Sequence, residues 1–211
     1  MARSGTARVR PLGGLAGKRQ AILDAGLRVF GRDGYTRGSI DTIAAEAGVS
    51  TRTIYNHFHD KAHLFRTVIQ ESASRVAGIQ IAIIDRHLAE VTDLEAGLVE
   101  FGRAFVTPVP ETADHFAMVR QINAEVGHIP QEAIDAWHEV GPLRVRRALA
   151  ERLRGLSTLG LRVDDPERAA LHLSLLVSAG NVPYRATAPT AAEIDDHVTS
   201  GVRAFLHGYR R

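Results

Sequence analysis

The stretch VSTRTIYNHFHDK, residues 49–61, gathers many hydrogen-bonding side chains around two large apolar residues, Ile54 and Phe58. Hydroxyl, guanidinium, amide and imidazole groups follow one another, at Thr51, Arg52, Thr53, Tyr55, Asn56, His57 and His59. Such groups could recognise a polar surface, transfer protons or bind a metal. Ile54 and Phe58 are four residues apart, so a helix would place both on one face and leave polar groups on the other. The stretch is therefore a candidate site whose chemistry the rest of the chain must decide.

Catalytic and metal-binding chemistry lack their usual patterns in this chain. His57, His59 and His63 are close in sequence, but no HExxH-type motif accompanies them. No G-x-S-x-G nucleophile motif occurs either. The glycine-rich LGGLAGK at 12–18 lacks the G-x-x-x-x-G-K-[ST] spacing of a phosphate-binding loop and follows no predicted strand. We therefore predict that the protein is not an enzyme and has no catalytic residue, metal or cofactor.

Composition places the chain among ordinary globular proteins. Its 211 residues are 45% hydrophobic and 24% charged. It has no cysteine, which excludes a disulfide scaffold and a zinc–thiolate site and fits a reducing compartment. The N-terminus lacks the apolar region of a signal peptide, and no stretch reaches 18 uninterrupted apolar residues. We expect no contact with a membrane and a cytoplasmic location.

Charge is distributed unevenly along the chain. Residues 1–78 carry 12 Lys+Arg and 6 Asp+Glu, a balance of +6. The other 133 residues carry 14 basic and 18 acidic groups, a balance of −4. A basic front end indicates a polyanionic partner, although a solvated charge run on a tail would give the same count. Charge alone leaves both interpretations open.

Apolar residues recur with helical spacing from Lys18 onward, beginning with Ile22, Ala25 and Val29. Gly34 is predicted to end this first helix. Three polar residues are placed to begin the next helices as N-caps: Ser39, Ser50 and Asp60. Residues 1–17 show no such spacing and are predicted to form a flexible basic arm.

Longer helices are predicted in the remainder, with apolar stripes over 94–105, 116–126, 134–153, 166–182 and 194–209. The segment that begins at Pro166 is apolar on nearly every side, which indicates burial between its own core and a partner. No alternating strand pattern is present. The sequence therefore predicts an all-α protein of about nine helices.

The two short helices IDTIAAEAG and VSTRTIYNHF are separated by a brief turn that contains Gly48, which is the helix-turn-helix arrangement. In that arrangement the first helix braces a second one, whose outer side fits the major groove of DNA. This predicts a three-helix DNA-binding domain at 18–62, followed by a larger helical domain at 63–211. The bare pattern also occurs in proteins that do not bind DNA.

The longer segment GYTRGSIDTIAAEAGVSTRTIYNHFHDKAHLF, residues 34–65, resembles the TetR family of transcriptional regulators. Further on, AEVGHIPQEAIDAWHEVGPLRVRRALAERL and LRVDDPERAALHL resemble the AefR-like C-terminal domain of that family. The resemblance covers residues 18 to about 180. It implies a homodimer that binds a near-palindromic double-stranded DNA operator, acts as a repressor and is released by a small-molecule effector.

The resemblance also implies roles for individual residues. Those that match phosphate-holding positions are Ser39, Ser50, Tyr55 and Lys61. Those that match the face approaching the bases are Thr51, Arg52, Asn56 and His57. Arg8 and Arg10 would lie along a neighbouring groove, as basic arms do. Arg52 and Asp41 depart from the commoner family pattern, because a small residue is frequent at the first and a basic one occurs at the second.

In the larger domain, apolar and aromatic residues could line an effector pocket: Phe101, Phe105, Phe116, Met118, Ile122, Trp137, His138 and Leu173. The same residues could equally form the plain core of a helical bundle. The last two helices are predicted to build the dimer contact as a four-helix bundle. Two alternatives remain at this point, an effector-independent DNA-binding protein and a helical carrier or enzyme without DNA function.

Overall fold

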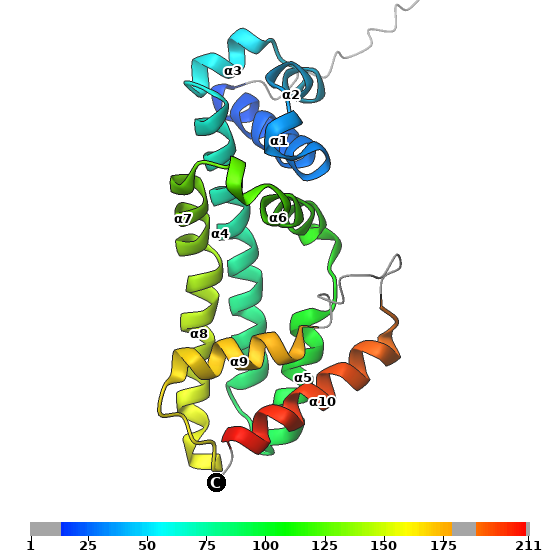
Figure 1. Cartoon of the computed structure of the whole chain (residues 1–211), viewed down its shortest axis with the longest axis vertical. Helices are drawn as coiled ribbons and strands as arrows, with labels where there is room; N and C mark the ends of the chain where they lie inside the picture. Colours follow the sequence, from blue (N-terminus) through cyan, green and yellow to red (C-terminus); the bar gives the residue numbers. More distant parts are fainter. Residues whose placement is uncertain (1–13, 179–188, 210–211) are drawn as a thin grey trace, which may run out of the picture. The chain divides into compact units, whose positions relative to one another are not determined.

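The computed structural model describes residues 14–178 and 189–209, and within these ranges it contains helices and no strand (Figure 1). The all-α prediction is thereby confirmed. The α-helices are α1 (Leu15–Arg37), α2 (Ile40–Ala47), α3 (Thr51–His57), α4 (Lys61–Leu88), α5 (Leu94–Val106), α6 (Ala113–Glu125), α7 (Gln131–Val140), α8 (Pro142–Gly155), α9 (Pro166–Val177) and α10 (Ala191–Tyr209). Short 3₁₀ helices occupy Pro110–Thr112, Val126–His128 and Leu156–Leu159. Arg8 and Arg10 lie outside the described residues.

The chain divides into two compact units. The first comprises the residues up to Ile69 together with 114–134, and the second comprises 70–113 together with 135–211. The predicted functional boundary after residue 62 therefore falls inside the first unit. Residues 114–134, far along the chain, pack with the N-terminal helices rather than with their sequence neighbours.

In the first unit, α1 buries one stripe that includes Ile22, Val29 and Phe30, each with no exposed surface. The helix begins at Leu15, three residues before the periodic pattern does. It breaks at Gly34, whose φ of 80° is a left-handed value that other residues rarely adopt. Below this break the ring of Phe65 on α4 lies 5.0 Å from that of Phe30 and 4.8 Å from that of Tyr35. These edge-to-face contacts fix the turn between α1 and α2 on the core.

The second unit contains α5, α8, α9, α10 and the part of α4 after Ile69 (Figure 1). Its core includes Phe101 on α5, Leu149 on α8, Leu173 on α9 and Val198 on α10, all fully buried. Each helix contributes one apolar stripe, so the core has the layered form that helical periodicity predicts.

Burial extends one helix of the chain, and a proline interrupts another. Helix α4 continues through Gly78 to Leu88, because Ile84 and Leu88 are almost fully buried and hold its second half on the core. The helix expected over 134–153 is interrupted at Gly141, where Pro142 begins α8. Proline lacks the N–H that would continue the preceding helix, and it suits the first position of a new one.

Among the described residues, no helix combines the length and the apolarity that crossing a membrane requires.

Candidate nucleic-acid interface

The turn between α2 and α3 is built from residues that cap helices. Ser39 Oγ accepts a hydrogen bond from Thr42 N at 3.0 Å, and Ser50 Oγ accepts one from Thr53 N at 3.2 Å. Gly48 ends α2 in a left-handed conformation with φ 65°. These caps satisfy backbone groups that such short helices would otherwise leave unpaired, and they confirm the helix starts predicted at Ser39 and Ser50.

Helix α3 is held down by its two apolar residues. Ile54 is 1% exposed and Phe58, just beyond the last residue of the helix, is 2% exposed. Three residues at i, i+3 and i+4 occupy the opposite side and are exposed: Arg52, Tyr55 and Asn56. Within the described part of the chain, none of these three side chains has an intramolecular partner. A guanidinium, a phenol and a carboxamide therefore share one outward face with their hydrogen-bonding capacity unused.

The other expected contacts on α3 flank this face. Thr51 and His57 are half-buried, and the His57 ring lies 6.2 Å from that of Phe58. Asp41 is exposed in the first turn of α2, where its charge suits the positive end of the helix dipole. The face formed by Arg52, Tyr55 and Asn56 is therefore flanked by residues that also contribute to local packing and helix stability.

Lys61, the first residue of α4, is engaged within the protein. Its Nζ donates to Thr36 O at 3.1 Å and lies 5.0 Å from the centre of the Tyr35 ring. Burial lowers the pKa of Lys61, and the nearby charge of Glu125 acts in the opposite direction. Ser39 and Ser50 likewise use their hydroxyls as caps. If these residues contact phosphates, they do so with hydroxyl and ammonium groups that also hold the helices in place.

Thr36 also donates hydrogen bonds to a carboxylate that is distant in the sequence. Glu125 Oε2, at the end of α6, accepts from Thr36 N at 2.9 Å and from Thr36 Oγ1 at 3.2 Å. Burial alone would raise the pKa of Glu125, but hydrogen bonds from Thr36 and the Tyr35 backbone outweigh it and hold that pKa below its ordinary value. Sequence reasoning did not identify Thr36 or Glu125, because nothing in the local pattern of either residue indicates the contact.

Ion pairs brace α1 against α2. Arg32 Nη1 lies 2.9 Å from Glu46 Oε1, and Arg28 Nε lies 3.5 Å from Glu46 Oε2. Arg32 also pairs with its neighbour Asp33 at 2.9 Å, which lowers the pKa of that carboxyl. The pairs are solvent-exposed, so each contributes little stability, and they mainly set the approach of the two helices.

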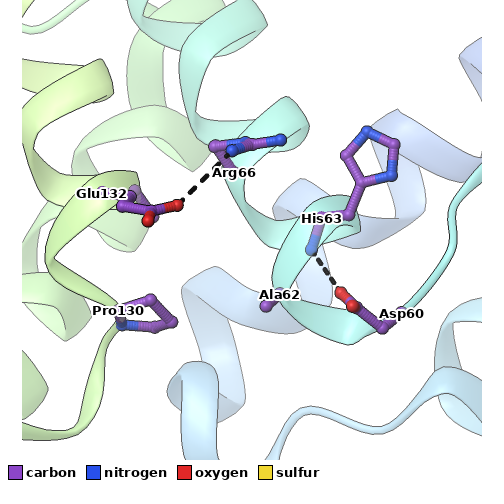
Figure 2. A pocket seen from close by; sticks show the side chains of 7 residues that line it. Asp60, Ala62, His63, Arg66, Pro130 and Glu132 are labelled. Atoms are coloured by element: carbon purple, nitrogen blue, oxygen red, sulfur yellow. Dashed lines mark hydrogen bonds and ion pairs between the residues drawn. The ribbon is translucent and has the colours of Figure 1, made fainter.

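An open polar pocket lies in the same unit, between the start of α4 and the start of α7 (Figure 2). Its lining includes Asp60, His63, Arg66 and Glu132, together with Pro130. Asp60 Oδ1 caps α4 by accepting from His63 N at 2.7 Å, and Arg66 lies 3.8 Å from Glu132, as the dashed lines in Figure 2 mark. Asp60, Arg66 and Glu132 thus already have partners within the lining of this pocket. Among the described residues, no group of three His, Asp or Glu side chains could hold a metal ion.

The residues expected at an effector pocket fall into both units. Phe116, Met118 and Ile122 belong to the first, whereas Phe101, Phe105, Trp137, His138 and Leu173 belong to the second. Four are core residues with at most 2% exposure: Phe101, Met118, Ile122 and Leu173. Phe116 and His138 are exposed, and Phe105 and Trp137 are half-buried. The indole Nε1 of Trp137 is buried and has no hydrogen-bond partner in the described part of the chain.

Comparison with known proteins gives the same picture over most of the chain. Residues 22–68 match the bacterial regulatory proteins of the tetR family, and residues 96–211 match the AefR-like transcriptional repressor, C-terminal domain. The HTH-type transcriptional regulator AcrR of Shigella flexneri is 40% identical over 63 residues, which are 30% of this chain and 29% of AcrR. The HTH-type transcriptional repressor AcnR of Corynebacterium diphtheriae is 29% identical over 161 residues, 76% of each chain.

Similar solved structures also come from transcriptional regulators. A protein from Mesorhizobium loti that is assigned to the TetR family superposes with a TM-score of 0.79 at 29% identity, covering 94% of this chain and all of its own. The flavonoid-responsive regulator FrrA superposes with a TM-score of 0.61 at 28% identity, covering 92% of this chain and 98% of its own. The AcrR match spans less than a third of that regulator, whereas the structural matches extend over nearly the whole length of both chains.

Proposed function

Because the chain belongs to the TetR family of bacterial transcriptional regulators, which are not enzymes, we propose that it is a ligand-responsive repressor. It binds a near-palindromic operator as a dimer and leaves that operator when a small molecule binds. The observation that carries this proposal is the outer face of α3. Arg52, Tyr55 and Asn56 are exposed and have no intramolecular partner among the residues that the structure describes, while the buried Ile54 and Phe58 anchor the helix from behind.

The side chains of this face suit base edges. A guanidinium can bind guanine O6 and N7 with two hydrogen bonds, and a carboxamide can bind adenine N6 and N7 in the same way. Phosphate contacts come from the two N-cap residues, Ser39 and Ser50, and from Tyr55 and Lys61. Thr51 and His57 extend the base-reading face at its edges. Arg8 and Arg10 reach into a neighbouring groove.

The apolar face of α9 supports a dimer. Three leucines there are exposed in the single chain: Leu171 at 40%, Leu175 at 60% and Leu176 at 37%. Exposure of several leucines on one helix is costly in water and indicates a partner surface. A second copy would cover it with its own α9 and α10 and complete a four-helix bundle. The dimer would carry two copies of α3 for half-sites one turn of DNA apart, roughly 34–36 Å.

Support for an effector comes from the second unit. Trp137 presents a buried indole N–H that has no partner in residues 14–178 and 189–209, and a buried donor of this kind favours a ligand with a hydrogen-bond acceptor. Two other residues of the expected pocket lie in the same unit, Phe101 and Phe105, and their rings are 5.2 Å apart. One similar regulator, FrrA, responds to flavonoids, so planar aromatic compounds that carry oxygen acceptors are the first class to screen.

Selection of bound sequences from random double-stranded DNA by the purified protein tests the DNA-binding part. We expect enrichment of an inverted repeat whose affinity falls steeply with salt, with a log–log slope of about −0.9 for each phosphate contact. Failure to enrich any sequence would contradict the proposal.

Fluorescence of Trp137, the single tryptophan of the chain, tests the effector part. A compound that releases the selected operator should also change this emission, and a Trp137→Phe variant should bind the compound more weakly. If no compound releases the operator although the operator is bound specifically, the protein is an effector-independent DNA-binding protein.

A further inference from the structure

Residue 36 is held from both sides of its own backbone. Its N–H and hydroxyl donate to Glu125 Oε2 at 2.9 and 3.2 Å, while its carbonyl accepts from Lys61 Nζ at 3.1 Å. One threonine thus connects the end of α6 to the start of α4 within the first unit. The carboxylate and the ammonium therefore bind opposite groups of the same residue.

Gly34 leaves the space that the carboxylate occupies. A Cβ at this position would overlap Glu125 Oε1 and Cδ. Gly34 also has the left-handed φ of 80° that breaks α1. The turn therefore has a shape that admits the Glu125 side chain and no side chain of its own.

The residues held by this turn border the predicted DNA-binding face on two sides. Ser39, which caps α2, follows Thr36 by three residues, and Lys61 begins α4 just after α3 ends. The position of the turn consequently determines where both helices begin relative to α3. Glu125 itself contacts the turn rather than α3.

We propose that Glu125 is a positioning residue for the DNA-binding surface, acting through Thr36 on the helix starts at Ser39 and Lys61. The inference rests on the proposed DNA-binding function and names a residue of α6 on which that function depends. Electrostatics alone predicts the opposite effect. A carboxylate in a DNA-binding unit repels phosphates, so its removal would strengthen binding if it had no positioning role.

The test compares Glu125→Gln with Glu132→Gln on the operator selected by the wild-type protein. Both changes remove one negative charge from the first unit. Glu132 makes a long, 3.8 Å ion pair with Arg66 and its side chain is 88% exposed, so it is the matched control. We expect Glu125→Gln to weaken binding on the order of tenfold, which is the scale of one lost charge-assisted hydrogen bond. Glu132→Gln should bind equally or slightly more tightly.

Further variants separate positioning from loss of folding. Glu125→Ala removes the acceptor that Gln retains, so its affinity should fall below that of Glu125→Gln. Gly34→Ala displaces the carboxylate without removing its charge, and its effect should not add fully to that of Glu125→Gln, because both changes break one contact. Affinities are compared at a temperature where circular dichroism shows every variant folded. In the wild type, the amide proton of Thr36 should titrate with the carboxylate in NMR spectra, and this titration should vanish in Glu125→Gln.

Three outcomes overturn the inference. The first is that Glu125→Gln binds the operator as tightly as the wild type or more tightly. The second is that it weakens binding no more than Glu132→Gln does, and the third is that its loss of binding equals the fraction of unfolded protein. The operator selection with the wild-type protein is done before any variant is made. If it yields no operator, the proposed function fails, and the role of Glu125 is not at issue.

Discussion

Ile54 lies on the inner side of α3 and Phe58 directly follows the helix, and their exposed fractions are 1% and 2%. Tyr55, between them in sequence, is 54% exposed on the outer side. A seven-residue helix has little stability of its own, so these two anchors fix its position.

Truncation of Phe58 should therefore affect mainly the stability of the protein, and truncation of Tyr55 mainly its binding to DNA. Phe58→Ala should lower the free energy of unfolding by about 3–5 kcal/mol, because it leaves a cavity under the helix. Tyr55→Ala should change it by no more than about 0.5 kcal/mol while weakening DNA binding. Chemical denaturation of both variants measures the first effect and a binding titration measures the second. Equal destabilisation by the two changes would show that α3 is not packed in this way.

Loss of the α3 cap should weaken the helix locally. Ser50→Ala removes the acceptor for Thr53 N and should cost about 1 kcal/mol of stability, in the usual range of roughly 0.5–2 kcal/mol for such caps. Ser50→Asp retains an acceptor and should restore most of this stability. Denaturation midpoints compare the three proteins, and an unchanged midpoint for Ser50→Ala would mean that the cap contributes nothing.

The exposed leucines of α9 predict the oligomeric state. Leu175→Glu places a charge on the proposed dimer surface and should convert dimers to monomers in sedimentation experiments, because a buried unpaired charge is costly. Leu15→Glu is the control, since Leu15 is 79% exposed at the start of α1 and lies in the other unit. If Leu175→Glu stays dimeric, or the wild type is monomeric, α9 does not form the contact.

Acid should weaken the first unit through Glu125. The pKa of this carboxyl is lower in the folded protein than its ordinary value, so the unfolded chain binds the proton more readily. The stability that the charged form contributes is complete above that ordinary value and is lost as the pH falls through the lower, folded value. The stability difference between wild type and Glu125→Gln should therefore shrink on acidification from pH 7. A difference that stays constant or grows at low pH would contradict the assignment.

Local features of the fold were predictable because local chemistry decides them. Ser39, Ser50 and Asp60 cap helices as short-range hydrogen bonding requires, and the 3.6-residue spacing identified the buried faces. The spacing of Ile54 and Phe58 likewise predicted which side of α3 faces outward.

Features that depend on distant parts of the chain were not predictable. Glu125 and Thr36 are 89 residues apart, and no periodicity relates them. Lys61 was expected to contact phosphates, and nothing in the sequence indicated that its Nζ also donates to a backbone carbonyl 25 residues earlier. Helix α4 runs through Gly78 because tertiary burial of its second half outweighs the weak helix propensity of glycine.

The central claim is that the outer face of α3 reads bases, and the affinity of Arg52→Ala for single-base variants of the selected operator tests it most directly. Arg66→Ala removes the same charge from α4 and serves as the control. We predict that Arg52→Ala costs about 1–3 kcal/mol on the selected operator and abolishes discrimination at one position of each half-site, and that Asn56→Ala does so at another. Arg66→Ala should keep the base preference intact. A loss by Arg52→Ala that is uniform across all operator variants, or no loss, would contradict base reading by α3.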